Sequence, residues 1–319
     1  MSKRPVVALI GPTAVGKTAL SLHLAQRFGS EIISGDSMQI YREMNIGTAK
    51  ASAAEQKQVR HHMIDIVDPT TNFDVSQFVQ TARQEIDAMP ITAVPLIVGG
   101  TGLYIQSVLF DFKLGQAPDN PIVRAKYEQL LSEQGKEALF AELEANDPVS
   151  ATLIHPNNTR RVIRALEVTE VTGIPFSQQQ PEPPQAHYPH LIIGLNTERE
   201  RLYERINQRV DQMMSEGLVA EVKALQSKLT ATTAYQAIGY KEILDYLDGR
   251  CSYEAAVDLI KQRSRHYAKR QLTWFNNRMN VSWLDAEDPE LLEKATKLVE
   301  NFINNTKKKL SNWDSFFVA

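Results

Sequence analysis

The chain has 319 residues, of which 43% are hydrophobic and 23% charged, with a formal net charge of −3. This composition is that of an ordinary globular protein and excludes wholesale disorder and fibrous structure. The single cysteine, Cys251, excludes an intrachain disulfide and a four-thiolate zinc or iron–sulfur site. A net charge near zero neither predicts nor excludes a nucleic-acid partner, because nucleic-acid binding depends on a local basic surface and not on the net charge.

Strands and helices alternate in the first third of the sequence. The uncharged run from Ala88 to Phe110 reaches the length of a membrane span, but its prolines and glycines favour a buried strand and a helix instead. Alternation of this kind predicts an α/β fold with a parallel sheet flanked by helices. The predicted elements are strands at Val6–Ile10, Glu31–Ser34 and Pro95–Val98 and helices at Thr18–Phe28 and Leu103–Phe110.

Charged amphipathic helices replace this pattern from about Gly115 to Tyr188, with Asp147 and Pro148 as a helix start. A strand at Leu191–Leu195 and helices at Glu198–Glu216 and Tyr253–Phe275 then resume the α/β pattern. We therefore expect a core domain of residues 1–114 and 189–319 and an all-helical insertion domain of residues 115–188. The chain is expected to be a cytoplasmic monomer without a membrane segment.

A phosphate-binding loop follows the first strand. The string Gly11-Pro12-Thr13-Ala14-Val15-Gly16-Lys17-Thr18 fits G-x-x-x-x-G-K-[ST] at every position. In such a P-loop, backbone N–H groups and the helix N-terminus face phosphate oxygens, the lysine adds a charge, and the threonine hydroxyl holds Mg²⁺. The loop does not reveal which phosphorylated molecule is bound.

Two further polar turns follow strands of the same sheet. Asp36 comes after the second strand and suits a general base or a ligand of magnesium-bound water, with an Asx-turn or helix cap as the structural alternative. Thr101, in Gly99-Gly100-Thr101-Gly102, suits a donor to a phosphate oxygen, with a plain tight turn as the alternative. These residues alone fit a small P-loop kinase in which Asp36 deprotonates an acceptor hydroxyl.

A basic segment lies near the C-terminus. Residues 259–278 contain no acidic residue, and Lys261, Arg265 and Lys269 recur at helical i, i+4 spacing. A solvated helix face is the ordinary interpretation of such a run, and an RNA-binding face is the functional one. Tyr267, Trp274 and Phe275 lie among the cations, where aromatic rings either stack on bases or belong to the core.

Several strings in this order resemble the bacterial tRNA dimethylallyltransferases, also called tRNA isopentenyltransferases. Besides the P-loop, they are Ser34-Gly35-Asp36-Ser37-Met38-Gln39-Ile40-Tyr41, Asn45-Ile46-Gly47-Thr48-Ala49-Lys50, His61-His62-Met63-Ile64-Asp65, Val98-Gly99-Gly100-Thr101-Gly102-Leu103-Tyr104, Arg164-Ala165-Leu166-Glu167-Val168, Ile238-Gly239-Tyr240-Lys241 and Ala268-Lys269-Arg270-Gln271-Leu272-Thr273-Trp274-Phe275.

The resemblance implies a P-loop NTPase-like fold and transfer of a dimethylallyl group from dimethylallyl diphosphate to N6 of the adenosine 3′ of the anticodon, position 37 of tRNA. The implied products are N6-isopentenyladenosine and diphosphate, and the implied cofactor is Mg²⁺ at Thr18. The target adenosine is expected to flip out of the anticodon stem-loop. No Asp-Asp pair occurs in the chain, so the P-loop would hold the diphosphate instead of an Asp-rich magnesium motif.

The resemblance also assigns roles to individual residues of this sequence. Asp36 is implied to be the base for the attacking amine, Thr101 a contact near the breaking bond, and Lys17 a catalytic cation. The implied diphosphate site comprises Gly11, Thr13, Ala14, Val15, Gly16, Lys17, Thr18 and Arg209. The implied tRNA contacts are Asp36, Ser37, Met38, Gln39, Thr101, Arg124, Arg160, Arg161, Arg164, Gly239, Lys241, Lys269, Arg270, Gln271 and Trp274.

The sequence departs from the family pattern at a few positions. Ala51 replaces a frequent proline, and Asn276 and Asn277 stand where an arginine is frequent, which weakens a backbone contact there. His61 and His62 invite a metal interpretation, but no third ligand is evident, so we expect a hydrogen-bonded loop. Three alternatives remain: an isopentenyltransferase acting on free adenine nucleotides, a P-loop phosphotransferase, and an RNA-binding protein without catalysis.

Overall fold

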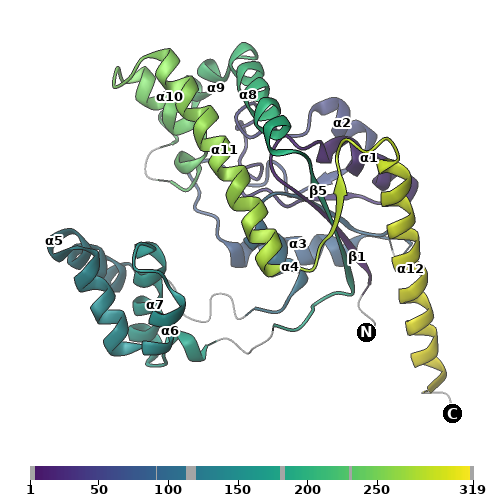
Figure 1. Cartoon of the computed structure of the whole chain (residues 1–319), viewed down its shortest axis with the longest axis horizontal. Helices are drawn as coiled ribbons and strands as arrows, with labels where there is room; N and C mark the ends of the chain where they lie inside the picture. The colour runs from purple at the N-terminus through teal and green to yellow at the C-terminus, as the bar shows by residue number, and fades with distance from the viewer. Residues whose placement is uncertain (1–3, 91, 113–119, 180–183, 230–231, 317–319) are drawn as a thin grey trace. The chain divides into compact units, whose positions relative to one another are not determined.

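A parallel sheet forms the centre of the computed structural model, which describes residues 4–90, 92–112, 120–179, 184–229 and 232–316 (Figure 1). Within these residues the sheet has six strands in the order β3-β2-β4-β1-β5-β6, and every pair is parallel. The predicted α/β fold with a parallel sheet is thereby confirmed. The strands are β1 (Val6–Ile10), β2 (Ile32–Ser34), β3 (His61–His62), β4 (Leu96–Gly99), β5 (His190–Asn196) and β6 (Ser282–Asp285).

The central strand β1 is apolar throughout because helices cover both of its faces. All five of its residues are buried. Val7 and Leu9 belong to a core cluster that also contains residues of α1 (Lys17–Arg27) and α12 (Leu291–Phe316). Side chains alternate along a strand, so Val6, Ala8 and Ile10 point to the other face. Burial on both faces explains why the strand reads as a continuous hydrophobic run in the sequence.

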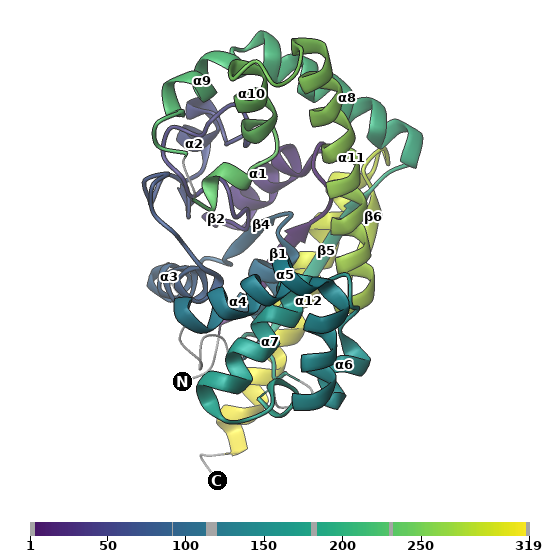
Figure 2. The same ribbon diagram turned by 90° about the vertical axis from the view of Figure 1, so that its left-hand side faces the viewer.

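The other helices of the core fall into two groups. In the first, α3 and α4 pack on each other and against β2 and β4. In the second, α8, α9, α10 and α11 pack successively on one another and lie next to one another in both views (Figures 1 and 2). Their bounds are α2 (Ala53–Gln58), α3 (Val75–Ala88), α4 (Gly102–Leu109), α8 (Arg199–Ser215), α9 (Leu218–Leu225), α10 (Tyr240–Leu247) and α11 (Tyr253–Arg278). Within the described residues, no helix combines the length and the hydropathy needed to cross a membrane.

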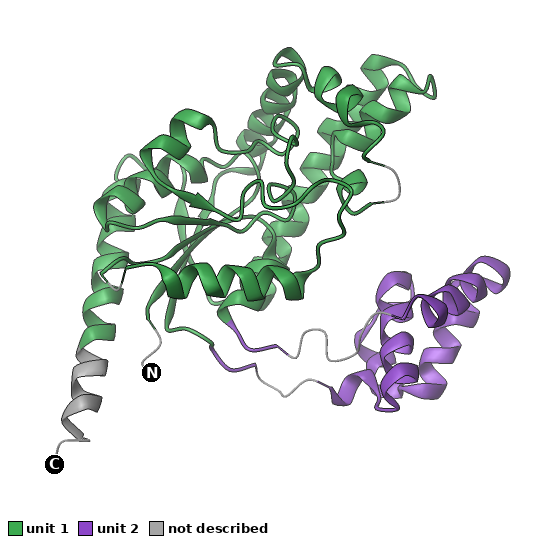
Figure 3. Ribbon diagram, turned by 180° about the vertical axis from the view of Figure 1, so that it is seen from behind, with its two compact units in different colours: residues 1–109, 187–319 green, residues 110–186 purple. Residues whose placement is uncertain are grey.

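The chain divides into two compact units, coloured separately in Figure 3: residues 1–109 with 187–319, and residues 110–186. The start of the insertion predicted from the sequence, at residues 114 and 115, lies outside the described residues. The second unit contains the helices α5 (Pro121–Asn146), α6 (Pro148–Leu153) and α7 (Thr159–Thr172). Helix α5 is interrupted at Gly135, whose φ of 83° is not helical.

Asp147 links the start of α6 to the segment around Ser177 in the second unit. The side chain accepts a hydrogen bond from the Ser150 N–H at 3.0 Å, which caps α6. It also accepts from the Ser177 N–H at 2.8 Å and from the Ser177 hydroxyl at 2.7 Å. Aspartate is a preferred capping residue because its oxygen satisfies an otherwise unpaired helix N–H. The helix start predicted at Asp147 and Pro148 is confirmed.

Glu167 is a completely buried carboxylate that joins α5 and α7. It accepts hydrogen bonds from Arg124 Nη2 at 2.8 Å, Arg164 Nη1 at 3.0 Å and the Asn120 N–H at 2.8 Å. Burial by itself would raise the pKa of Glu167, but these hydrogen bonds outweigh it and lower the pKa. The carboxylate therefore stays ionised and fixes both arginines.

Replacing Glu167 tests this arrangement. Glu167→Ala leaves two guanidinium groups and one N–H without their shared partner, and we expect the second unit to lose about 3 kcal/mol of stability. Native-state hydrogen exchange of amides in α5 and α7 measures the loss. Glu170→Ala is the control, because that exposed carboxylate bonds Lys126 and Tyr127 between the same helices. An exposed pair is worth about 0–1 kcal/mol, so equal losses in the two variants would contradict the role of Glu167.

Candidate active site

The P-loop turns between β1 and α1, as its sequence predicts. Gly16 adopts a left-handed φ of 102°, and α1 begins at the next residue, Lys17. The Lys17 Nζ group donates hydrogen bonds back to the carbonyl oxygens of Gly11 at 2.9 Å and Pro12 at 2.7 Å. The loop thus holds its lysine at the N-terminus of the helix, where the backbone dipole also favours an anion.

The turns after β2 and β4 meet at the same edge of the sheet. A Cβ atom on Gly99 would lie only 2.4 Å from the carbonyl carbon and oxygen of Gly35, so the two backbones require a glycine there. Thr101 links the turns through hydrogen bonds from its N–H to the Gly35 carbonyl at 3.1 Å and from the Ser37 N–H to its Oγ1 at 3.0 Å. Thr101 therefore fixes the position of the segment that carries Asp36.

Asp36 forms an Asx-turn and also lies where a general base could act, so the structural and the functional interpretations of this residue are compatible. Its Oδ1 accepts the Met38 N–H at 2.9 Å, which is the hydrogen bond of an Asx-turn. The same side chain also lines a cavity that contains the P-loop. Burial raises the pKa of Asp36, and the Met38 hydrogen bond and the charge of Lys17 oppose that rise. A carboxylate with a raised pKa is a stronger proton acceptor.

Gln271 of α11 connects the P-loop to the turn after β4. Its Oε1 accepts the Thr13 N–H at 3.0 Å, and its Nε2 donates to the Gly100 carbonyl at 2.9 Å. The side chain is buried, with 5% of its surface exposed. Sequence reasoning named Gln271 only as a tRNA contact and did not find this link, since its partners lie more than 150 residues away. The Thr13 N–H is engaged by Gln271, so the Thr13 side chain is the part of that residue left to meet a ligand.

A cavity of about 590 Å³ lies over the P-loop. Lys17, Arg209 and Arg270 contribute three cationic side chains to its lining, and Asp36 contributes a carboxylate. Helices α8 and α11 and the segment before α10 add an apolar region that the sequence did not indicate. The apolar side chains are Ile206, Met213, Ala237, Ile238 and Ile260, and Tyr267 lines the cavity from α11.

The surroundings of Lys17 lower its affinity for a proton. Its pKa falls to about 7, chiefly because of burial and also because of the charge of Arg209, while Asp36 opposes both effects. Burial also lowers the pKa of Arg209, against the attraction of Asp36. An anion in the cavity would relieve this repulsion, because it favours the charged forms of both groups.

The cations of α11 divide into paired and exposed groups. Lys261 forms an ion pair with Asp211 of α8 at 2.6 Å, and Arg265 donates to Asn207 of the same helix at 2.7 Å. These two members of the predicted basic stripe therefore hold α11 against α8. Lys269 and Arg270 are exposed. Arg270 stacks over the Tyr267 ring, and Arg278 lies 4.9 Å from the centre of the Trp274 ring.

The other predicted tRNA contacts lie in several places. In the second unit, Arg160 and Arg161 are exposed on α7. Arg124 and Arg164 both donate hydrogen bonds to Glu167. In the core, Gly239 precedes α10 with a φ of 99°, and its N–H donates to Glu242 at 2.8 Å. Lys241 lies over the Tyr235 ring. The Gln39 amide is engaged by protein, since its Oε1 accepts the Ser34 hydroxyl at 2.9 Å.

His61 and His62 form the edge strand β3 and not the loop that the sequence suggested. His62 Nε2 lies 2.5 Å from a Glu31 oxygen, and its Nδ1 lies 2.7 Å from a Glu85 oxygen. Among the described residues, no group of three or more His, Cys, Asp or Glu side chains is arranged to hold a metal ion.

The altered pKa of Lys17 makes anion binding depend on pH. The pKa of Lys17 is lowered to about 7 in the free protein, and the negative charge of a bound anion raises it. Inorganic diphosphate should therefore bind with uptake of up to one proton by Lys17 at pH 8. Calorimetric titrations in buffers of different ionisation enthalpy measure this uptake. Lys17→Met corrects for protonation of diphosphate itself, and identical uptake by both proteins would contradict the assignment.

Known proteins share both the sequence and the architecture of this chain. Residues 39–278 match the family model described as IPP transferase. A tRNA dimethylallyltransferase of Geobacillus thermodenitrificans is 52% identical over 300 residues, covering 93% of this chain and 95% of that protein. A crystal structure of the full-length tRNA isopentenylpyrophosphate transferase of Bacillus halodurans is 43% identical, with a TM-score of 0.74, covering 97% of this chain and 100% of that one.

A eukaryotic dimethylallyltransferase acting on tRNA gives a TM-score of 0.79 at 30% identity, covering 95% of this chain and 80% of that one. The relatives' matches extend over both units, and the family-model match covers about three quarters of the chain, from residue 39 to residue 278. The chain belongs to the IPP transferase family.

Proposed function

We propose that this protein is a tRNA dimethylallyltransferase that moves a dimethylallyl group from dimethylallyl diphosphate to N6 of the adenosine 3′ of the anticodon. The observation that carries the proposal is the cavity, which unites a P-loop and its lysine with two arginines, a carboxylate and an apolar wall. The cationic region suits a diphosphate, and the apolar wall suits a five-carbon group. The curated relatives with this name, at about half identity over most of the chain, support the same reaction.

In the proposed reaction, the bond between the allylic carbon and the diphosphate oxygen breaks, and its electron pair leaves with diphosphate. Lys17, Arg209 and the N–H groups at the start of α1 stabilise the charge that develops on that oxygen. A new bond forms between the allylic carbon and N6 of adenosine, and Asp36 takes the N6 proton. The exocyclic amine is a weak nucleophile because its lone pair is delocalised into the ring, so a positioned base contributes to the rate.

Magnesium is the proposed cofactor, held by the Thr18 hydroxyl together with diphosphate oxygens. Mg²⁺ commonly takes one or two protein ligands and completes its shell with substrate phosphates and water. Thr18 lines the cavity beside Lys17, which fits this mode of binding. When bound, the ion would neutralise charge on the leaving diphosphate.

The tRNA would meet exposed cations of α11 and α7, including Lys269, Arg270 and Arg160. Phosphate contacts from such residues supply affinity, and base contacts supply selectivity. Asp36 lies in the cavity, so the target adenosine would have to leave the anticodon-loop stack to reach it.

A tRNA substrate also implies that the protein works in the cytoplasm. The proposed active form is a monomer.

Nucleoside mass spectrometry tests the reaction directly. The protein is incubated with an unmodified anticodon stem-loop RNA, Mg²⁺ and dimethylallyl diphosphate, and we expect an isopentenyl group on one adenosine. Modification of free adenosine monophosphate but not RNA would support the nucleotide enzyme instead. Consumption of ATP without prenyl transfer would support a phosphotransferase, and binding of RNA without any reaction would support a binding protein.

Asp36→Asn separates catalysis from loop structure. The asparagine oxygen still accepts the Met38 N–H and preserves the Asx-turn, but the amide is not a base. We expect turnover to fall by about 10²- to 10⁴-fold, with tRNA affinity changed only a few-fold. Single-turnover rates and filter binding measure the two quantities. Turnover within tenfold of the wild type would exclude Asp36 as the general base.

Lys269→Ala tests the RNA face of α11. Each phosphate contact contributes about 0.9 to the slope of log K against log salt concentration, so the loss of Lys269 should reduce the slope by about that amount. Lys261→Ala is the matched control on the same helix, because Lys261 is paired with Asp211. Binding of the stem-loop at several salt concentrations gives both slopes. Equal slopes for the wild type and Lys269→Ala would remove Lys269 from the interface.

A further inference from the structure

The segment after β2 forms one wall of the cavity in an unusual backbone conformation. Gly47, Thr48, Ala49 and Ala51 line the cavity from this segment. Ala49 has a φ of 47° and nearby Glu43 a φ of 65°, which are left-handed values for residues other than glycine. Such conformations cost energy and persist where the surroundings impose them. The structure must therefore contain groups that hold this wall.

The carboxylate of Glu221 in α9 is the principal group that holds this wall. Its Oε2 accepts the N–H groups of Asn45 at 3.0 Å and Ile46 at 2.8 Å, and its Oε1 accepts the N–H of Gly47 at 3.1 Å. Three consecutive backbone donors therefore converge on one side chain. Hydrogen bonds to an ionised acceptor are roughly twice as strong as neutral ones, so this single residue contributes much of the order in the wall.

Tyr240 extends the same arrangement to the start of α10. Its hydroxyl donates to Glu221 Oε1 at 2.6 Å, and its ring lies so close to Gly47 that a Cβ there would be 2.4 Å from Cε2. Burial raises the pKa of Tyr240, and the neighbouring charge of Glu221 raises it further, so the hydroxyl remains a donor. Glu221 and Tyr240 together lock the wall against the helical group α9 and α10.

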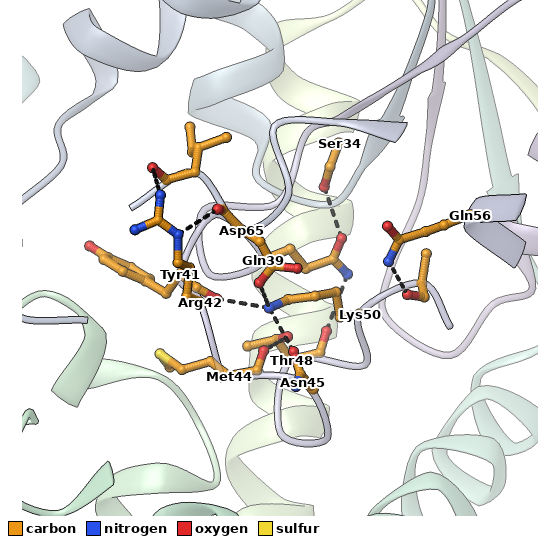
Figure 4. Close-up of polar contacts among 12 residues, drawn as sticks. Ser34, Gln39, Tyr41, Arg42, Met44, Asn45, Thr48, Lys50, Gln56 and Asp65 are labelled. Atoms are coloured by element: carbon orange, nitrogen blue, oxygen red, sulfur yellow. Dashed lines mark hydrogen bonds and ion pairs between the residues drawn. The ribbon is translucent and has the colours of Figure 1, made fainter. Parts of the chain in front are cut away.

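Lys50, Gln39 and Thr48 add further hydrogen bonds to the same segment, as Figure 4 shows. The Lys50 ammonium is 3% exposed and lies 2.8 Å from the Tyr41 carbonyl and 2.6 Å from Asp65 Oδ1. The Gln39 amide nitrogen donates to the carbonyls of Thr48 and Ala49, both at 3.2 Å. The Thr48 hydroxyl donates to the Met44 carbonyl at 2.7 Å.

These bonds engage the N–H groups of residues 45–47, the carbonyls of Thr48 and Ala49 and the Thr48 hydroxyl. The lining residues Gly47, Ala49 and Ala51 have no polar side-chain group, and the one hydroxyl, of Thr48, is bonded to Met44. This wall completes the apolar lining from α8 and α11, which includes Ile206 and Ile260. The phosphate end of the cavity, in contrast, is built from the P-loop and Arg209, and Glu221 contacts none of these groups in the described structure.

We propose that Glu221 is a positioning residue that, by holding the wall at residues 45–49, makes the cavity prefer a diphosphate with a small apolar group over diphosphate alone. The inference rests on the proposed function, because it requires dimethylallyl diphosphate to occupy this cavity. It predicts a ratio of two affinities, which a loss of folded protein does not change.

The experiment measures dissociation constants of dimethylallyl diphosphate and inorganic diphosphate by calorimetry on the full chain with Mg²⁺. For Glu221→Gln, we expect the preference for the prenylated ligand to fall about tenfold, while the affinity for inorganic diphosphate stays within about twofold. Tyr240→Phe removes one of the four hydrogen bonds and should reduce the preference less. Lys228→Gln is the control, because its ion pair with Glu43 joins the same two regions at the surface without touching the wall N–H groups.

Two results would overturn the inference for Glu221. One is an unchanged preference in Glu221→Gln, and the other is a parallel loss of both affinities, which indicates a general structural role. A wild-type protein that binds both ligands equally would overturn the proposed donor as well. Thermal melting of each variant shows that the protein is folded at the temperature of the titration. The ratio of the two dissociation constants is compared only among folded variants.

Discussion

The close crossing of two turns at the carboxyl edge of the sheet is the constraint on which the site depends. Gly35 and Gly99 allow the backbones after β2 and β4 to touch, and Thr101 and Gln271 then bond the touching segments to each other and to the P-loop. Because β4 lies between β1 and β2 in the sheet, this crossing brings the phosphate loop and Asp36 into one cavity. In parallel sheets, such edges are where ligands bind.

Three glutamate side chains stabilise other parts of the molecule in the same way, because each accepts hydrogen bonds from several groups at once. Glu167 collects Arg124, Arg164 and a backbone N–H, while Glu221 collects three N–H groups and a tyrosine hydroxyl. Glu242, which is 1% exposed, bonds the Gly239 N–H and Arg263. Each carboxylate holds a segment that we associate with substrate binding. Several loops and helix ends are thereby fixed before any ligand arrives, which reduces the entropy lost on binding.

Local patterns predicted the parts of the fold that are locally determined. The strand β1 and the P-loop follow from a buried apolar run and a glycine motif, and the strands β2, β4 and β5 lie within one or two residues of their predicted bounds. The two-residue strand β3 is too short for any periodicity, and β6 and the helices α3 and α12 were not predicted. Gln271, Glu221 and the pairing of Lys261 with α8 depend on partners far away in the sequence, which periodicity does not reveal.

The hydrogen bonds from Lys17 to the carbonyls of Gly11 and Pro12 have a consequence for how fast a ligand enters. The Lys17 amine already lies at the loop, and α1 begins directly beside it, so the side chain is in place before a ligand arrives. An arriving anion exchanges two neutral acceptors for charged ones, which requires rotation of a side chain and not refolding of a loop. Rotations of side chains occur in picoseconds to nanoseconds. We therefore expect diffusion and electrostatic attraction, rather than loop rearrangement, to limit the rate at which an anion associates.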